Sequence, residues 1–163
     1  TYDLDAKGMQ EIFKEAAKHK GTSFVEIYQN CNIFNDGTFS AIYERSVRED
    51  RILRLKHGEV LVFGKDKNKG IRMRGLKPVI VDLDKDFNEK DLLIHDQYCE
   101  DSTLANLLSG FDYPDFPVPM GIFRQVENST YGEKIEEQIK TQIEKKGVGN
   151  LEKLLRGNQV WTN

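Results

Sequence analysis

The sequence has no apolar stretch that could cross a membrane. Of its 163 residues, 38% are hydrophobic and 31% are charged, and no apolar run approaches the roughly 20 residues that a transmembrane helix needs. No charged segment followed by an apolar one opens the chain, so we expect a cytoplasmic protein. A formal net charge of −3 gives no electrostatic reason to expect nucleic acid as a partner.

Cysteines and the common catalytic motifs are also scarce. Cys31 and Cys99 are the only cysteines, which is too few for a disulfide framework in a chain of this length. Glycine-rich phosphate loops, the His-Glu-x-x-His zinc motif and Cys-x-x-Cys pairs are absent. The three histidines lie too far apart in the sequence to have metal-ligand spacing: His19, His57 and His95.

The most informative stretch that is present is an apolar run that ends near a cysteine. Four apolar residues lie within residues 24–28, as in a parallel strand that is covered on both faces. Asparagine, aspartate and glycine dominate the residues after Cys31 and favour irregular backbone. We therefore predict a strand over residues 22–28 that places Cys31 in a loop at its carboxyl end, where open α/β sheets bind ligands.

The segment before this strand has the pattern of a helix. Apolar residues recur at helical spacing over residues 5–20, with Asp5 suited to cap the start and Gly21 to end it. A helix, a glycine and a strand form the αβ half of a βαβ unit. Nothing upstream in this chain supplies the parallel neighbours that such a strand requires. We therefore expect residues 1–40 to complete a sheet that lies elsewhere, in a longer protein from which this chain was cut.

A β-rich region follows. Short β-prone runs predict a small antiparallel meander, and they lie at residues 52–55, 60–63, 71–74 and 79–83. Further on, the pattern predicts a helix from Thr103 to Ser109 that ends at Gly110. A proline-rich run then leads into a short strand that we expect over residues 122–126.

The tail has its own helix signal. Thr130 and Glu133 have the spacing of a capping box and predict a helix that runs to about Lys146. An apolar residue occurs at every fourth position and makes a narrow stripe on an otherwise charged helix: Tyr131, Ile135, Ile139 and Ile143. Two interpretations stay open, a helix that docks on a partner and a solvated helix that packs on its own domain.

Cys31 is the main candidate for chemistry. A thiolate at a strand end can be a nucleophile or a metal ligand. A nucleophile needs a base within reach, and none is nearby in the sequence. A zinc or iron–sulfur site needs three companions, of which Cys99 supplies at most one. His95 and Asp96 are adjacent, so their side chains should point apart rather than form a dyad. These residues by themselves leave the role of Cys31 open.

Residues 21–35 read Gly-Thr-Ser-Phe-Val-Glu-Ile-Tyr-Gln-Asn-Cys-Asn-Ile-Phe-Asn and end in a Cys-x-x-Phe-Asn motif. This stretch resembles the late segment of the β subunit of 2-oxoacid:ferredoxin oxidoreductases, closest to the 2-oxoglutarate type. Further matching runs follow in order and extend the resemblance over nearly the whole chain: Phe63-Gly64, Gly70-Ile-Arg72, Val79-Ile-Val-Asp-Leu83, Ile94-His-Asp96, Phe116-Pro-Val-Pro-Met-Gly-Ile-Phe-Arg124 and Thr130-Tyr131.

The resemblance implies an α/β fold in three parts. Residues 1–47 would be the last αβ unit of a thiamine-diphosphate-binding fold. Residues 48–126 would be a β-rich region with the small antiparallel meander, and residues 127–163 a C-terminal helical tail. The intact β subunit would bind thiamine diphosphate, Mg²⁺ and a [4Fe–4S] cluster and work with an α subunit. It would oxidatively decarboxylate a 2-oxo acid, which the subtype indicates to be 2-oxoglutarate, to the acyl-CoA and CO₂, and reduce ferredoxin.

Only part of the family's machinery matches this sequence. By the resemblance, Cys31 corresponds to the fourth cluster ligand, the one set apart in sequence, whereas Cys99 matches no ligand. The Gly-Asp-Gly-Asp motif for diphosphate and magnesium and the other three cluster cysteines belong to the family's N-terminal half and are absent here. We therefore expect the chain alone to be inactive, with no catalytic residue and no cofactor, and to need the missing N-terminal part of the β subunit as a partner.

Two other functions stay open. A stand-alone binding or assembly module that keeps the fold without catalysis would be a stable monomer. A cut piece would instead expose unpaired strand edges that associate with other chains. The other alternative is an enzyme that uses Cys31 as a nucleophile.

Overall fold

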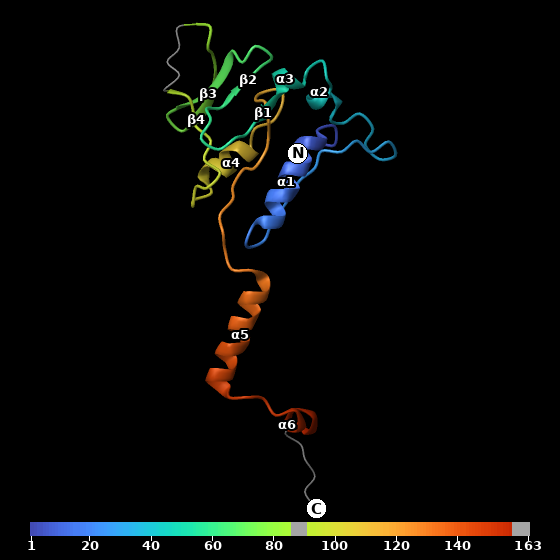
Figure 1. The fold of residues 1–163 in the computed structure, drawn as a ribbon, viewed down its shortest axis with the longest axis vertical. Coiled ribbons are helices and arrows are strands. Elements are labelled where there is room, and N and C mark those ends of the chain that lie inside the picture. The colour runs from blue at the N-terminus through green and yellow to red at the C-terminus, as the bar shows by residue number, and fades with distance from the viewer. Residues whose placement is uncertain (86–90, 158–163) are drawn as a thin grey trace, which may run out of the picture. The chain divides into compact units, whose positions relative to one another are not determined.

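The computed structural model describes residues 1–85 and 91–157, which form two compact units (Figure 1). The first unit comprises Thr1–His19 and Ser23–Val126, and the second comprises Lys20–Thr22 and the described residues from Glu127 onward. Within the described residues, no helix is long and apolar enough to span a membrane. The fold is mixed α/β, with one two-stranded sheet and one three-stranded sheet.

The first helix, α1, is confirmed and spans Ala6–Lys18. The Asp5 carboxylate caps it by accepting a hydrogen bond from the Gly8 N–H at 3.1 Å. Arg54 donates to the same carboxylate at 3.0 Å and so ties the start of α1 to the following sheet. Partial burial opposes ionisation of Asp5, but the hydrogen bonds from Gly8 and Arg54 outweigh it and lower the Asp5 pKa.

The strand predicted over residues 22–28 is not formed. The segment makes one isolated bridge, in which Tyr28 pairs in parallel with Tyr2. The Asp3 N–H donates to the Tyr28 carbonyl at 3.1 Å, and the Tyr28 N–H donates to the Thr1 carbonyl at 2.9 Å. Phe24 is 87% exposed, although a parallel strand needs cover on both faces. For this chain the strand prediction is therefore wrong, because the described residues give the segment only that one bridge.

The first sheet is parallel and joins β1, Ile52–Arg54, to β5, Val118–Met120. Two short helices precede β1: α2, Ser40–Tyr43, and α3, Arg48–Arg51. The strand that we predicted over residues 122–126 is wrong, because the strand in this region is Val118–Met120, which lies a few residues earlier and includes Pro119. Both strands of a two-stranded sheet are edge strands, where the missing proline N–H is tolerated.

The antiparallel meander is confirmed as a sheet in the order β2-β3-β4. Its strands are β2, Val62–Phe63, β3, Lys69–Arg74, and β4, Lys77–Asp82. The run at residues 52–55 does not join it, because β1 pairs with β5 instead. Gly70 on β3 lies so close to Leu92 that a Cβ there would be 2.5 Å from the Leu92 side chain. Only glycine allows this approach without a shift of the leucine.

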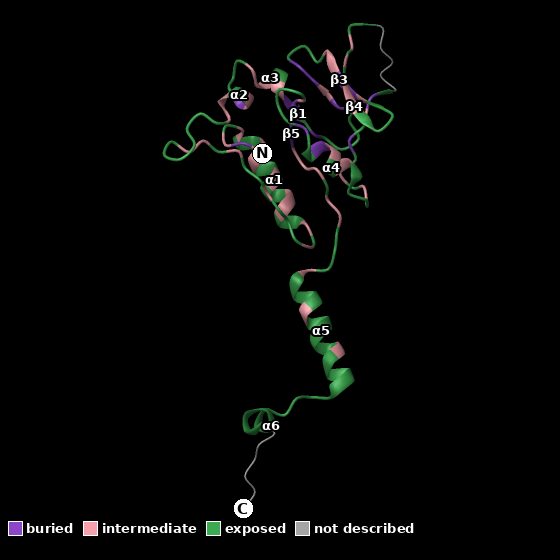
Figure 2. Cartoon of the chain, turned by 180° about the vertical axis from the view of Figure 1, so that it is seen from behind, coloured by how far each residue is buried: buried purple, intermediate pink, exposed green. Residues whose placement is uncertain are grey.

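Two apolar clusters hold the first unit together, as the buried segments in Figure 2 show. One packs the meander and β1 against α4, the confirmed helix Thr103–Ser109 that ends at Gly110; its buried members are Leu53, Leu55, Leu61, Phe63, Ile71, Leu108 and Phe111. The other lies around the parallel sheet and the N-terminal residues; its buried members are Tyr2, Tyr43, Ile52, Val118 and Met120.

The second unit contains α5, Tyr131–Lys146, and α6, Leu151–Arg156. The capping box is confirmed, because the Glu133 N–H donates to Thr130 Oγ1 at 3.2 Å and the Thr130 N–H donates to the Glu133 carboxylate at 2.8 Å. Lys20 belongs to this unit and lies 3.4 Å from the Glu133 carboxylate. Neither helix has a buried residue.

His95 joins three segments of the first unit. Its side chain is fully buried, and its Nε2 lies 2.8 Å from the Ile122 carbonyl. Its backbone N–H donates to the Glu59 carbonyl at 2.9 Å, and its carbonyl accepts from the Gly58 N–H at 2.8 Å. The ring Nδ1 has no hydrogen-bond partner among the described residues. The neutral tautomer with a proton on Nε2 suits this environment, because a proton on Nδ1 would have no acceptor.

We expect this histidine to make the protein less stable in mild acid. Burial lowers the His95 pKa, against the opposing effect of the Ile122 carbonyl. The unfolded chain therefore binds this proton more readily, and the free energy of unfolding falls as the pH drops below the ordinary histidine pKa of about 6.5. Urea unfolding between pH 8 and pH 5 measures the slope. His95→Gln keeps a donor for Ile122 and should flatten the slope; an unchanged slope in the variant would contradict this assignment.

Candidate functional site

The loop that carries Cys31 is attached to the apolar cluster around Tyr2. Tyr28, three residues before the cysteine, stacks on Phe39 with ring centroids 4.5 Å apart. Tyr2 is almost fully buried and stacks on Tyr43 at 5.6 Å. Tyr2 and Tyr28 also share a backbone bridge. Both the backbone and the side chain of Tyr28 therefore hold the start of the loop in place.

A single asparagine closes the loop over residues 30–37. The Asn30 side-chain N–H₂ donates to Asn32 Oδ1 at 2.7 Å and to Asp36 Oδ1 at 2.9 Å. Its Oδ1 accepts from the Gly37 N–H at 2.8 Å, and its backbone N–H donates to Asp3 Oδ2 at 3.2 Å. The irregular loop predicted from the asparagines is therefore present, and Asn30 uses both donors and the acceptor of its amide to shape it.

The backbone of this loop turns back on Cys31. The Asn35 N–H donates to the Cys31 carbonyl at 2.9 Å and closes a tight turn. Hydrogen bonds from the backbone N–H groups of Phe34 and Ile33 lower the Cys31 pKa, and the Asn35 N–H adds to them against a smaller effect of burial. Amide hydrogen bonds favour the thiolate, which is the form of cysteine that binds metals.

Cys99 has the opposite environment. Burial raises the Cys99 pKa, and the Asp101 carboxylate raises it further, with Sγ and Oδ2 at 3.5 Å. The part of the chain that the structure describes contains no group of three or more His, Cys, Asp or Glu residues that could hold a metal ion. The structure therefore sets the two cysteines apart chemically and assigns the thiolate-favouring surroundings to Cys31.

Two large apolar side chains follow the cysteine in the loop and are almost fully exposed. Ile33 is 83% exposed and Phe34 is 89% exposed. The same two residues donate the backbone N–H groups that lower the Cys31 pKa. At a metal centre that cysteines ligate, the surrounding apolar residues control solvent access, and amide hydrogen bonds to the sulfurs help to set the reduction potential. Sequence reasoning missed both residues, although the Cys-x-x-Phe-Asn motif contains Phe34.

The surroundings of Cys31 do not suit a nucleophile. The groups that shift its pKa are backbone amides of the loop and burial, with no basic side chain among them. A cysteine nucleophile needs an adjacent base to accept its proton or a cation to stabilise the thiolate during turnover. This observation weighs against an enzyme that uses Cys31 as a nucleophile.

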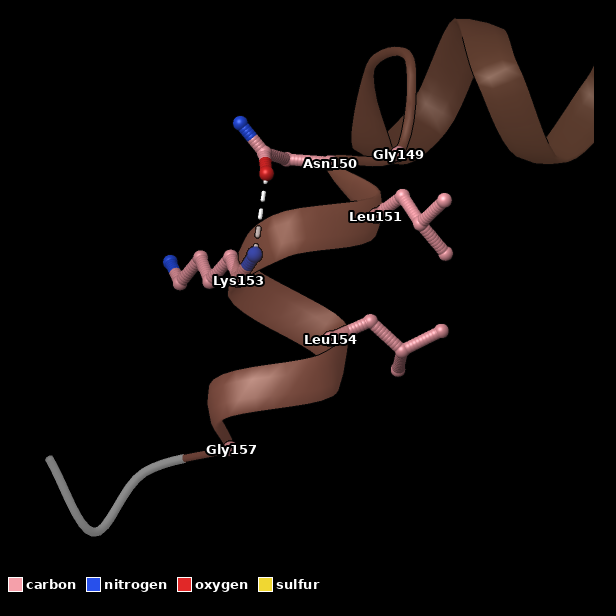
Figure 3. Close-up of a pocket in the computed structure, with 6 residues that line it drawn as sticks. All are labelled: Gly149, Asn150, Leu151, Lys153, Leu154 and Gly157. Carbon is pink, nitrogen blue, oxygen red and sulfur yellow. Dashed lines mark hydrogen bonds between the residues drawn. The ribbon is translucent and has the colours of Figure 1, made fainter.

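The other candidate residues do not assemble into a site. Asp96 lies 3.4 Å from Nδ1 of His57, whereas His95 faces the Ile122 carbonyl, so His95 and Asp96 contact different partners as expected. A hollow beside α6 is lined by two leucines, a lysine, an asparagine and two glycines (Figure 3). In that view Leu151 and Leu154 point to one side and Lys153 to the other. Its lining has no acid–base pair and no metal-ligand set.

Comparison with known proteins confirms the resemblance found in the sequence. The chain is 31% identical over 168 aligned positions to the 2-oxoglutarate oxidoreductase subunit KorB of Mycobacterium tuberculosis. The match takes in 98% of this chain and 43% of that protein, in its C-terminal portion. The chain thus spans less than half the length of this relative. No family model and no solved structure matches the chain, so the thiamine-diphosphate-binding fold of residues 1–47 stays a prediction.

The contrast between the two cysteines gives a direct test of the loop. We expect Cys31 to react with iodoacetamide at lower pH than Cys99, because its pKa is lowered and that of Cys99 is raised. The pH profile of alkylation in Cys99→Ser reports Cys31, and the profile in Cys31→Ser reports Cys99. Coinciding profiles, or a higher midpoint for Cys31, would show that the loop amides do not stabilise its thiolate.

Proposed function

We propose that this chain is the C-terminal part of the β subunit of a cytoplasmic 2-oxoglutarate:ferredoxin oxidoreductase, in which Cys31 is one ligand of a [4Fe–4S] cluster. The observation that carries the proposal is the loop itself. It holds a cysteine whose pKa is lowered by loop amides, followed by two exposed apolar residues, in a chain similar to KorB over 98% of its length.

The residues present fit one ligand of such a cluster. A [4Fe–4S] cluster is held by four thiolates, and Cys31 offers one thiolate that the loop amides favour by lowering its pKa. Hydrogen bonds to a ligating sulfur help to set the reduction potential of the cluster. The other three ligands would come from the N-terminal part of the β subunit. Cys99, with its raised pKa and carboxylate neighbour, is not one of them.

The exposed residues around the loop fit the same assignment. Phe24 and Ile33 are each more than four-fifths exposed, and residues 22–28 make a single isolated bridge. Apolar side chains and backbone groups of this kind are stabilised by burial against further strands. The N-terminal part of the β subunit would supply those strands, and it would place the other cluster ligands beside Cys31.

The remaining cofactors would bind outside this chain. Thiamine diphosphate, when bound with Mg²⁺, supplies the carbanion stabilisation that decarboxylation of a 2-oxo acid requires. The intact enzyme, with its α subunit, would convert the 2-oxo acid and coenzyme A to the acyl-CoA and CO₂ and pass two electrons to ferredoxin. The role of this chain would be to orient one cluster ligand and shield it from water, and the chain alone would be inactive.

A stand-alone binding module is the second candidate. The two buried clusters of the first unit favour it, because each packs residues from distant parts of the chain. The exposed apolar side chains of the loop weigh against it, because an independent domain would bury them or use them as an interface.

In the intact oxidoreductase, Cys31→Ser should lower the iron content and strongly reduce ferredoxin reduction, because a serine hydroxyl does not replace a thiolate ligand. Decarboxylation of the 2-oxo acid with an artificial electron acceptor should persist, because the thiamine site lies elsewhere. Cys99→Ser is the matched control and should keep both iron and ferredoxin reduction. Wild-type iron and electron transfer in the Cys31→Ser enzyme would overturn the assignment.

A further inference from the structure

Both ends of the loop over residues 30–37 are anchored to neighbouring parts of the first unit. At one end, the Asn30 backbone N–H donates to Asp3 Oδ2 at 3.2 Å. At the other end, the Gly37 carbonyl accepts from the Ser40 N–H at 3.0 Å and from Ser40 Oγ at 2.7 Å. The N-terminal residues and α2, which begins at Ser40, both contribute to the second apolar cluster. These anchors leave only the path between them to be fixed.

Between the anchors the loop is exposed to water. Residues 32–38 are all exposed, so the burial of apolar surface does not fix their path. Water also competes for each exposed hydrogen bond, and a single bond of this kind contributes little. A definite path therefore needs several hydrogen bonds that converge on one group. The side-chain amide of Asn30 is such a group, because its hydrogen bonds reach residues two, six and seven positions further along the chain.

An asparagine suits the three partners at this position. Its N–H₂ group faces two oxygens, Asn32 Oδ1 at 2.7 Å and Asp36 Oδ1 at 2.9 Å, and its Oδ1 faces the Gly37 N–H at 2.8 Å. The opposite orientation of the amide would set its oxygen against the Asp36 carboxylate and its N–H₂ group against the Gly37 N–H. An aspartate would have no donor and would place a second carboxylate beside Asp36.

The part of the loop that Asn30 closes contains Cys31 and the amides that act on it. The N–H groups of Ile33 and Phe34 form hydrogen bonds with Cys31. The side chains of these two residues are 83% and 89% exposed, so no packing of their own holds the amides in place. The hydrogen bonds of Asn30 bracket both residues, because they reach the chain before Ile33 and after Phe34.

We propose that Asn30 is a positioning residue for the cluster ligand Cys31. Its side-chain amide holds the loop in the path that keeps the N–H groups of Ile33 and Phe34 beside the cysteine, and it thereby raises the reduction potential of the cluster. Asn30 acts through the loop amides and does not contact the metal itself. This inference rests on the proposed function, because it takes Cys31 as a ligand.

The direction of the effect on the potential follows from charge. Reduction adds one negative charge to a [4Fe–4S] cluster, so N–H donors to a ligating sulfur stabilise the reduced form more than the oxidised form. Without the Asn30 amide, the loop amides lose their fixed path and this stabilisation weakens. The potential should therefore shift to a more negative value.

Hydrogen exchange in the 163-residue chain tests whether Asn30 holds the loop. In Asn30→Ala the Gly37 amide loses its acceptor, and the amides of residues 33–37 should exchange about tenfold faster, which is the effect of losing an ordinary hydrogen bond. Asn68→Ala is the matched control, because Asn68 also donates to an aspartate, at 3.2 Å from Asp84 Oδ2, elsewhere in the first unit. It should leave the exchange of residues 33–37 unchanged.

In the intact oxidoreductase, potentiometry monitored by electron paramagnetic resonance measures the effect on the cluster. Asn30→Ala should keep the iron content of the wild-type enzyme and shift the reduction potential to a more negative value. Asn68→Ala should change neither quantity. The potential separates positioning from a merely structural role, because loss of structural support would lower the yield of the enzyme without changing the potential of the clusters that remain.

A reversal of polarity provides the rescue. Asn30→Asp keeps an acceptor for the Gly37 N–H but places a carboxylate against Asp36, so the potential should be more negative than in Asn30→Ala. Asp36→Asn added to Asn30→Asp supplies an amide that donates to the introduced carboxylate and should return the potential toward the wild-type value. Asp36→Asn added to Asn30→Ala removes the same charge without making that bond, so it should raise the potential by a smaller amount.

Two results would exclude this role of Asn30 and leave the proposed function intact. One is unchanged exchange of the loop amides in Asn30→Ala. The other is an unchanged potential in Asn30→Ala, in an enzyme whose Cys31→Ser variant loses iron. Wild-type iron content in Cys31→Ser would instead refute the proposed function, and this inference with it, whatever the Asn30 variants show. The failure of each can therefore be told apart.

Discussion

The pairing of Tyr2 with Tyr28 determines where the cysteine loop lies. Two backbone hydrogen bonds of about 3 Å join residues 1–3 to Tyr28, and Tyr2 is buried in the second apolar cluster. Asp3 extends the pairing to Asn30, whose side chain closes the loop around Cys31. The parallel sheet of β1 and β5 completes the cluster that Tyr2 enters. The position of the one candidate ligand therefore depends on a short contact between the N-terminal residues and residues 28–30.

Apart from this pairing, the segment before the loop has few backbone partners among the described residues. Residues 22–28 have the composition of a covered strand, yet Phe24 and Ile27 are exposed and the segment makes only one bridge. Cys31 likewise has its thiolate favoured by loop amides and no companion ligands among the described residues. Under the proposed function, the neighbouring strands and the remaining ligands come from the rest of a longer subunit that is similar to KorB.

Local signals in the sequence predict the elements that local interactions stabilise. Asp5 and the capping box of Thr130 and Glu133 mark the starts of α1 and α5, because a cap involves residues only three positions apart. The meander follows from turns between adjacent strands. Long-range pairing is not predictable in the same way: β1 pairs with β5, more than 60 residues away in the sequence. Pro119 argues against a strand when only the sequence is known, whereas its edge position permits one.

The candidate site shows the same division. The residue type of Cys31 and the motif around it identify the cysteine, and the asparagines predict the loop. The amide hydrogen bonds from Ile33 and Phe34 to its sulfur depend on the folded path of the backbone, which no residue type in the sequence encodes. The buried environment of His95 arises from segments that are 27 or more residues apart in the chain. The sequence alone therefore does not predict it either.

Hydrogen–deuterium exchange of residues 22–28 tests the central claim most directly. The account predicts that backbone amides of this segment exchange rapidly in the isolated chain, where they lack strand partners. In the intact β subunit they should be protected about a hundredfold or more, because neighbouring strands then accept their hydrogen bonds. Equal exchange in the chain and in the intact subunit would contradict the account, because the segment would then gain no neighbours from the rest of the protein.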